Sequence, residues 1–268
     1  MGTVKFFSLS SGSNGNCYYI GNEETGLLID AGIGPRTIKK RLQEHGVSMD
    51  NVDFLLVTHD HIDHIKGLGM VAQKYFKPVY ATEKLHVSLE NHSCTRCRLT
   101  GCVRKTVAGE PSVYKGVTFI PFVVPHDATE TVGYFIDFYG KKFTFLTDVG
   151  AVTEDVIKYC RMSEIVIFES NYDLDMLLTG SYTPELKVRI VQGEGHLSNE
   201  QAASAVKRFW HKNLSHLFLC HLSENNNTPA LAHKAIKKAL EEAGAVPDKD
   251  THLICLPRMN VSELYEFK

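Results

Sequence analysis

The sequence lacks the features of a membrane protein. It has no apolar run approaching the roughly 20 residues that a helix needs to cross a bilayer. It also lacks a secretory signal, because residues 1–5 lead directly into the strand-like segment Phe6–Leu9. We therefore expect a cytoplasmic protein with no membrane partner.

A strong excess of one charge is also missing, as is a disulfide framework. The formal net charge is only −2, so nucleic acid is not attracted by the chain as a whole and must be bound by local groups or metal ions. The seven cysteines are odd in number and scattered, which suits a reducing compartment better than a set of disulfides. The sequence does not choose between a monomer and a homodimer.

Strand patterns alternate with helix patterns along all 268 residues, with no linker or low-complexity tract. The alternation repeats loosely after about residue 115. It predicts two halves, each a mostly antiparallel sheet covered by helices, packed sheet on sheet into four layers. The predicted strands are Val4–Leu9, Cys17–Ile20, Gly26–Asp30, Phe54–Thr58, Val117–Val124, Thr131–Phe138, Lys142–Thr147, Ile165–Glu169, Leu217–Cys220 and Val261–Phe267. The predicted helices are Pro35–Glu44, Leu68–Tyr75, Glu83–Asn91, Thr153–Cys160, Asn199–Trp210 and Pro229–Ala243.

Three histidines and two aspartates are concentrated in His59–His64, directly after a predicted strand. Alternation along an extended segment places His59 and His61 on one side, and Asp63 and His64 at the turn into the next helix. One tetrahedral ion cannot comfortably take all of these donors, whereas two ions about 3.5–4 Å apart can divide them. The segment therefore predicts a site for two metal ions rather than a polar surface loop.

This string, one earlier motif and three later motifs resemble, in chain order, the motifs of the metallo-β-lactamase superfamily. The others are a strand ending in aspartate, Leu27–Gly32, then Pro125–Asp127, Phe145–Gly150 and Leu219–His221. The resemblance implies an α/β fold with a four-layer αββα sandwich, as one domain over residues 1–268. A β-CASP cap insertion is not expected, because Asp148 and His196 are too close in the sequence to enclose one.

The resemblance also implies how the donors are shared between two divalent ions. His59, His61 and His126 would hold the first ion, Asp63, His64 and His221 the second, and Asp148 would bridge both. Asp30 would orient a ligand imidazole from outside the first shell of ligands; the alternatives are a strand-end turn for Asp30 and surface positions for His126 and His221. Mixed histidine and carboxylate ligands suit zinc or manganese, with iron as a further candidate.

Glu169, His196 and His221 resemble a trio found in the nuclease branches of the superfamily. There the histidine matching His196 protonates the leaving oxygen, and the carboxylate matching Glu169 steadies it, while a hydroxide held between the metals attacks phosphorus. Asp63 would also hydrogen-bond this hydroxide. The alternative is that His196 only lies next to a helix cap. Ser198 would be the better cap, with its hydroxyl accepting a hydrogen bond from the backbone near Gln201.

The segments Ser8–Cys17 and His221–Asn226 are similar to those of the bacterial YycJ (WalJ) family, which is regarded as exonuclease-like on DNA from 5′ ends. The expected partner is thus nucleic acid, DNA rather than RNA, because the long arm of transfer-RNA-processing enzymes is missing. The alternatives on the same site are hydrolysis of a small ester, thiolester, lactone or small cyclic phosphodiester. A non-catalytic relative is disfavoured by the complete ligand set.

Two loops are candidates for contacting the substrate. Ser13 and Asn14 lie in the glycine-containing loop Ser11–Asn16, whose backbone N–H groups would receive phosphate oxygens unless the loop is only a hairpin turn. Asn225 and Asn226 follow the last histidine motif and would contact a nucleic-acid backbone, or simply lead into the next helix.

A separate segment contains Cys94, Cys97 and Cys102 with His92 nearby. One C-x-x-C pair without a matched second pair is weak evidence for zinc, so a loop of reduced cysteines is the preferred interpretation.

Overall fold

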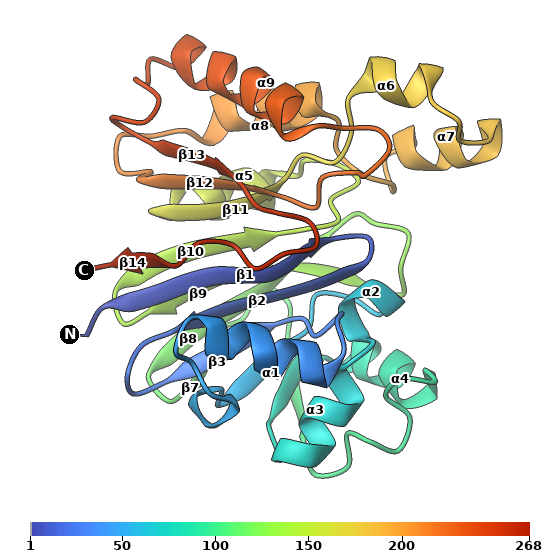
Figure 1. The fold of residues 1–268 in the computed structure, drawn as a ribbon, viewed down its shortest axis with the longest axis vertical. Helices are drawn as coiled ribbons and strands as arrows, with labels where there is room; N and C mark the ends of the chain where they lie inside the picture. Colours follow the sequence, from blue (N-terminus) through green and yellow to red (C-terminus); the bar gives the residue numbers. More distant parts are fainter. Residues whose placement is uncertain (1) are drawn as a thin grey trace. The chain divides into compact units, whose positions relative to one another are not determined.

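The computed structural model describes residues 2–268, which divide into two compact units (Figure 1). The first contains the chain up to Pro121 together with Ala128–Glu130 and Pro257–Lys268. The second contains Phe122–Asp127 and Thr131–Leu256. Two units of this kind agree with the repeated pattern in the sequence, whereas a single domain over the whole chain stays a prediction.

The first unit is built on a seven-stranded sheet with the order β14-β1-β2-β3-β4-β5-β6. Its first three pairings, from β14 to β3, are antiparallel, and the next three, from β3 to β6, are parallel. Parallel strands need both faces covered, and β3, β4 and β5 are accordingly buried throughout. The strands are β1 (Val4–Gly12), β2 (Gly15–Gly21), β3 (Gly26–Ile29), β4 (Phe54–Leu56), β5 (Val79–Thr82), β6 (Val103–Thr106) and β14 (Tyr265–Phe267).

Helices cover one face of this sheet, with α1 and α3 lying side by side in Figure 1. Proline at the first position of α1 suits a helix start, and the same helix buries Ile38 and Leu42, one turn apart, against Phe7 and Leu28 of the sheet. The Thr82 hydroxyl caps α4 by accepting from the Leu85 N–H. The helices are α1 (Pro35–Glu44), a 3₁₀ turn (Met49–Asn51), α2 (Ile62–Ile65), α3 (Leu68–Tyr75) and α4 (Glu83–Asn91).

The second sheet has the order β13-β12-β11-β10-β9-β8-β7. The pair β9–β10 is antiparallel, whereas β10, β11, β12 and β13 are parallel neighbours. β8 runs from the first unit into the second, and its first half forms an antiparallel hairpin with β7. The strands are β7 (Ser112–Tyr114), β8 (Val117–Val124), β9 (Thr131–Phe138), β10 (Lys141–Leu146), β11 (Ile165–Glu169), β12 (His216–Cys220) and β13 (His252–Cys255).

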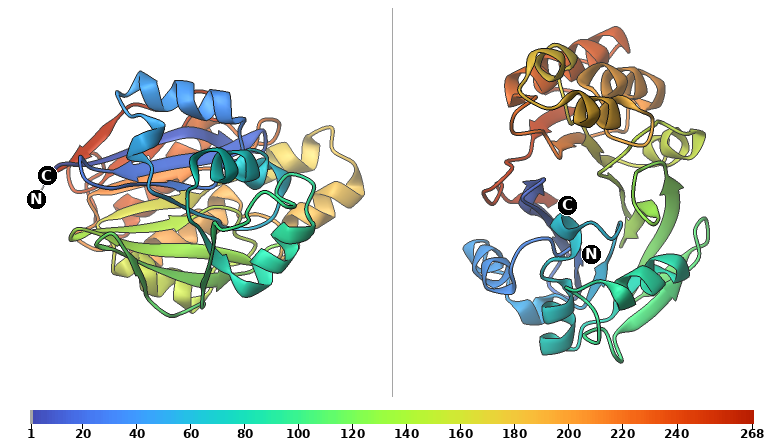
Figure 2. Two further views of the ribbon diagram at one scale, coloured as in Figure 1. Left: turned by 90° about the horizontal axis from the view of Figure 1, so that it is seen from below. Right: turned by 90° about the vertical axis from the view of Figure 1, so that its right-hand side faces the viewer.

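In the second unit, α8 and α9 pack side by side along the strands β12 and β13 (Figures 1 and 2). Ser198 begins α8 with a capping box: its hydroxyl accepts from the Gln201 N–H, and the Gln201 side chain accepts from the Ser198 N–H. The prediction that Ser198 caps this helix is confirmed. The helices are α5 (Glu154–Arg161), α6 (Leu174–Thr179), α7 (Pro184–Val191), α8 (Asn199–Phe209) and α9 (Pro229–Glu242).

The sheets are more evenly mixed than the mostly antiparallel sheets expected from the sequence. The short parallel strands β5, β6 and β13 were not predicted, and they supply much of this difference. β6 consists of Val-Arg-Lys-Thr and is largely exposed, so it has no apolar alternation. α7 was not predicted either, and it buries none of its residues. No helix within residues 2–268 is both long enough and apolar enough to span a bilayer.

Candidate metal centre

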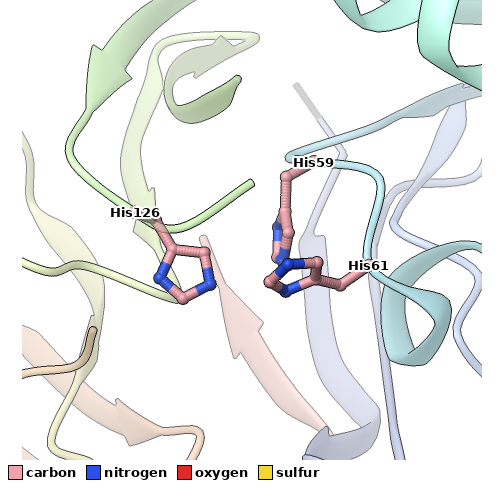
Figure 3. Close-up of side chains that lie close together, drawn as sticks. All are labelled: His59, His61 and His126. Atoms are coloured by element: carbon pink, nitrogen blue, oxygen red, sulfur yellow. The ribbon is translucent and has the colours of Figure 1, made fainter. Parts of the chain in front are cut away.

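The first group of donor side chains lies in the loop between β4 and α2. β4 has parallel neighbours on both sides, so its carboxyl end opens at an edge of the sheet where functional loops gather. His59 and His61 follow β4 with ring centroids 4.7 Å apart (Figure 3). α2 brings the His64 ring to 4.0 Å from that of His59, and the Asp63 Oδ2 atom lies 3.5 Å from His64 Nε2. Four predicted ligands therefore meet within the first unit.

Asp30, directly after β3, is fully buried and positions the His64 ring. Its Oδ2 atom lies 2.7 Å from His64 Nδ1, and both carboxylate oxygens accept hydrogen bonds of 2.8 Å from the backbone and hydroxyl of Thr58. Burial raises the pKa of the Asp30 carboxyl, although His64 and Thr58 favour its charged form. The sequence reasoning missed Thr58, whose position as the last residue before the histidines was the available signal.

Asn16, also missed, connects the β1–β2 hairpin to these ligands. Its Nδ2 atom lies 2.9 Å from His64 Nε2 and 3.3 Å from Asp63 Oδ2, and it donates to the Gly12 carbonyl at 3.1 Å. The Tyr18 hydroxyl donates to Asn16 Oδ1 at 3.1 Å, so the amide is held from both ends. Its place directly before the apolar segment Cys17–Ile20 was the available signal, and the structure buries Asn16 completely.

The second group of donors comes from separate elements of the second unit. Asp148 follows β10, Glu169 ends β11, His221 follows β12, and His196 precedes α8. One ligand atom of each lies within 4.8 Å of the others, and only His196 is partly exposed. His126, which follows β8 and is also drawn in Figure 3, places Nε2 3.6 Å from Asp148 Oδ1. Clustered nitrogen and carboxylate donors of this kind fit a divalent metal ion.

Glu169 is the charged centre of this second group. Its Oε1 atom lies 2.8 Å from His196 Nδ1 and 3.0 Å from His221 Nδ1, and Oε2 accepts from the backbone of Val149 and Leu197. Burial opposes the charge of Glu169, but the two histidines outweigh it and lower its pKa to about 2. Burial likewise opposes the charge of His196, but Glu169 outweighs it and raises the His196 pKa. Glu169 therefore favours the protonated form of His196.

Three of the predicted ligand histidines share one orientation. The Nδ1 atoms of His64, His126 and His221 lie 2.7 Å, 2.8 Å and 3.0 Å from the Asp30 carboxylate, the Gly195 carbonyl and the Glu169 carboxylate, respectively. A carbonyl oxygen and an ionised carboxylate only accept hydrogen bonds, so Nδ1 carries the proton and Nε2 carries the lone pair. Metal-binding histidines characteristically donate their second N–H to an acceptor of this kind.

Asp60 points away from its histidine neighbours and anchors their loop. It accepts hydrogen bonds from the hydroxyls of Ser88 and Thr129 and, at 3.3 Å, from the Thr129 N–H. Burial opposes its charge, but these bonds prevail and lower the Asp60 pKa. Alternation placed Asp60 on the side opposite His59 and His61, which was a signal for a structural role.

The predicted substrate residues occupy two different environments. Ser13 and Asn14 form the exposed turn between β1 and β2. Asn225 is also exposed, and its amide donates to the Tyr182 hydroxyl at 3.1 Å. Asn226 is only 1% exposed, so its side chain lies beneath the surface, and a contact with the substrate stays a prediction for all four residues.

Cys94, Cys97 and Cys102 belong to none of the metal-binding clusters found in residues 2–268. All seven cysteines of the chain are free thiols. The interpretation of this segment as a loop of reduced cysteines stays a prediction.

Three comparisons place the chain among known proteins. Residues 25–221 match the family model described as the β-lactamase superfamily domain. Exodeoxyribonuclease YycJ of Bacillus anthracis is 35% identical over 246 residues, which are 90% of each chain. Exodeoxyribonuclease WalJ of Streptococcus pneumoniae is 34% identical over 89% of each chain. The crystal structure of the metallo-β-lactamase fold protein YhfI from Bacillus subtilis has a TM-score of 0.71 at 14% identity and covers both chains completely.

Proposed function

The chain belongs to the metallo-β-lactamase superfamily and, within it, to the family of the YycJ and WalJ proteins, and from this premise we propose that it is a metal-dependent DNA exonuclease acting from 5′ ends. The predicted metallo-β-lactamase fold class and the prediction of a hydrolase are confirmed. The nuclease activity and the DNA substrate are proposed because the named relatives carry both in their names and align over nearly their whole length.

The observation that carries the proposal is the shared orientation of His64, His126 and His221, whose Nδ1 atoms are engaged by acceptors. We assign His59, His61 and His126 to one divalent ion, Asp63, His64 and His221 to a second, and Asp148 to both. Zinc and manganese suit these donors, as does iron. Two such ions supply a nucleophilic water near neutral pH and neutralise charge on the phosphate.

His196 is the proposed proton donor to the leaving oxygen of the phosphodiester. Glu169 holds the Nδ1 side of the ring at 2.8 Å, which directs the opposite nitrogen to the substrate. Glu169 is itself held by two backbone N–H groups, at 2.9 Å and 3.1 Å, so the ring has a fixed support. An alkoxide leaving group needs this proton, whereas a thiolate does not. Asp63 is proposed to hydrogen-bond the attacking water as well as to bind metal.

A cytoplasmic location completes the proposal. DNA is available there, and seven free thiols are stable in a reducing compartment.

The test is cleavage of end-labelled single- and double-stranded DNA and RNA by the purified protein with manganese or zinc. We expect shortening of DNA from the 5′ end, and a loss of about 10²–10⁴-fold in kcat for His196→Ala. His252→Ala, an exposed histidine of β13, is the matched control and should retain activity. Cleavage of small esters, thiolesters, lactones or cyclic phosphodiesters but not DNA would assign the site to those substrates instead. A normal rate for His196→Ala on DNA would remove the proton-donor role.

A further inference from the structure

A cationic cavity of about 210 Å³ lies in the first unit beside the β1–β2 turn. Its lining includes Lys66, Arg41, Ser10, Thr37 and Asn14, with an apolar wall that contains Ile33. Two lining residues are cations and none is a carboxylate, so the cavity favours an anion. Its volume is below the roughly 300–1,000 Å³ of pockets for whole drug-sized ligands, which suits one phosphate with part of a sugar.

The positive charge of this cavity is not neutralised by carboxylates of the protein. Within residues 2–268, neither Arg41 nor Lys66 forms an ion pair with a carboxylate. Arg41 instead donates to the Leu9 carbonyl at 2.6 Å and to the Met259 carbonyl, which fixes its guanidinium in place without neutralising it. Lys66 is exposed, and its long side chain is able to reach a ligand.

The residues that line the cavity are close in sequence to the donor group of the first unit. Lys66 lies two positions after His64, at the end of α2. Asn14 belongs to the turn that leads into Asn16, whose amide lies 2.9 Å from His64 Nε2 and 3.3 Å from Asp63 Oδ2. Lys66 therefore lies two positions from a proposed metal ligand, and Asn14 lies two positions from a residue that contacts two of them.

We propose that this cavity binds a phosphate of the DNA strand next to the phosphate that is hydrolysed. The inference rests on the proposed function and adds a substrate subsite to it. Lys66 and Arg41 supply charge, the Thr37 hydroxyl supplies a hydrogen-bond donor, and Ile33 contacts the sugar. The phosphate is either a terminal 5′-monophosphate or an internal phosphodiester, which share this chemistry.

The first test compares Lys66→Gln with Lys39→Gln, an exposed lysine of α1 that does not line the cavity. The substrates are 5′-phosphorylated DNA, 5′-hydroxyl DNA and bis(p-nitrophenyl) phosphate, which has no neighbouring phosphate. We expect the ratio of kcat/KM on DNA to kcat/KM on the small phosphodiester to fall roughly tenfold in Lys66→Gln and in Thr37→Val, and not in Lys39→Gln. An unchanged ratio in both cavity variants would overturn the inference.

The two substrate ends identify the source of the phosphate. If the cavity holds the terminal monophosphate, the wild-type protein prefers the phosphorylated 5′ end and Lys66→Gln abolishes that preference. If it holds an internal phosphodiester, Lys66→Gln weakens both DNA substrates equally.

A binding experiment separates this inference from the proposed function. Fluorescence anisotropy with a labelled single-stranded oligonucleotide, in chelator and at several salt concentrations, does not require cleavage. We expect Lys66→Gln to bind more weakly and to reduce the slope of log K against log salt by about 0.7, the value for one phosphate contact. If the wild-type protein cleaves no DNA, the proposed function fails. Weaker and less salt-dependent binding of the oligonucleotide by Lys66→Gln would still support the cavity as a phosphate-binding site. Equal binding by Lys66→Gln and Lys39→Gln refutes it.

Discussion

The two units use the same strand plan but distribute their donors differently. In the first, antiparallel β2–β3 is followed by parallel β3-β4-β5-β6; in the second, antiparallel β9–β10 is followed by parallel β10-β11-β12-β13. Asp30 after β3 and Asp148 after β10 occupy corresponding places, with φ angles of 58° and 55°. One scaffold therefore supplies a matching aspartate in each unit.

The remaining donor residues are arranged differently in the two units, although the strand plan is the same. The first unit places His59, His61, Asp63 and His64 in one segment after β4. The second unit collects its donors from the ends of β8, β10, β11 and β12 and from the segment before α8. Parallel strands end at one edge of a sheet, so both arrangements bring side chains together there. A local cluster depends on one loop, whereas a distributed cluster depends on the whole sheet.

The largest expected difference between the units concerns the matching aspartates. Asp148→Asn removes the proposed shared ligand and should lower kcat/KM on a phosphodiester by about 10³-fold or more, with loss of bound metal. Asp30→Asn removes only the support of His64 and should cost about 10–100-fold. Asparagine tolerates both left-handed backbones, so the two variants are matched. Activity assays with metal analysis measure the effect, and equal losses would show that the two aspartates act alike.

An intermediate effect is expected from the two amides that support the histidine segments. Asn16→Ala removes contacts to His64 and Asp63, whereas Asn171→Ala removes a 2.7 Å bond from its side chain to the His221 carbonyl. The first should weaken metal affinity about tenfold, because it touches ligand atoms directly. The second should lower the free energy of unfolding by about 1–3 kcal/mol, because a buried carbonyl loses its donor. Metal titration and denaturant unfolding distinguish the two effects. Loss of stability in Asn16→Ala together with loss of metal affinity in Asn171→Ala would contradict the difference drawn between the local and the distributed cluster.

The smallest effect concerns the acid stability of the second sheet. Burial and the neighbouring His252 lower the pKa of His216 on β12 to about 4, from about 6.5 in the unfolded chain. The unfolded state therefore binds the proton first, and stability falls as the pH drops from about 6.5 to about 4. His216→Gln should match the wild-type Tm at pH 7.5 and exceed it by about 2–4 °C at pH 5.

The elements around His216 define the conditions of that experiment. The Ser215 hydroxyl lies 3.0 Å from His216 Nδ1, the backbone N–H of His216 donates to the Glu164 carbonyl, and the His252 ring lies 4.9 Å away. His252 is exposed and acts on the pKa of His216 through its charge, so it is the neighbour to replace as a control. If the Tm of the wild-type protein falls no more than that of the variant between pH 7.5 and pH 5, the predicted link between His216 protonation and stability is wrong.

Sequence patterns predict the first unit's cluster better than the second's network. The four donors of His59–His64 need no tertiary information, because strand alternation places His59 and His61 together and the turn into the next helix adds Asp63 and His64. The bounds of β8, β9, β11, α1, α3 and α4 were also predicted correctly, since each has a clear apolar period. The grouping of Glu169 with His196 and His221 came only from a resemblance between motifs.

Other features lack any periodic signal. β13 contains only four residues, and α7 has no buried face. The contact of Thr58 with Asp30 depends on the parallel pairing of β3 with β4, which places Asp30 beside the loop after β4. Distances between segments remote in the sequence follow from sheet register, which composition and spacing do not encode.

Asp30, Asp148 and His221 all adopt left-handed backbone conformations, with φ between 52° and 58°. For residues with a Cβ atom this conformation costs of order 1–2 kcal/mol, so each of these proposed metal-site side chains is retained at some expense to folding. Glycine would relieve that strain and remove the chemistry. The three positions therefore hold strain that a protein selected for stability alone would have no reason to keep.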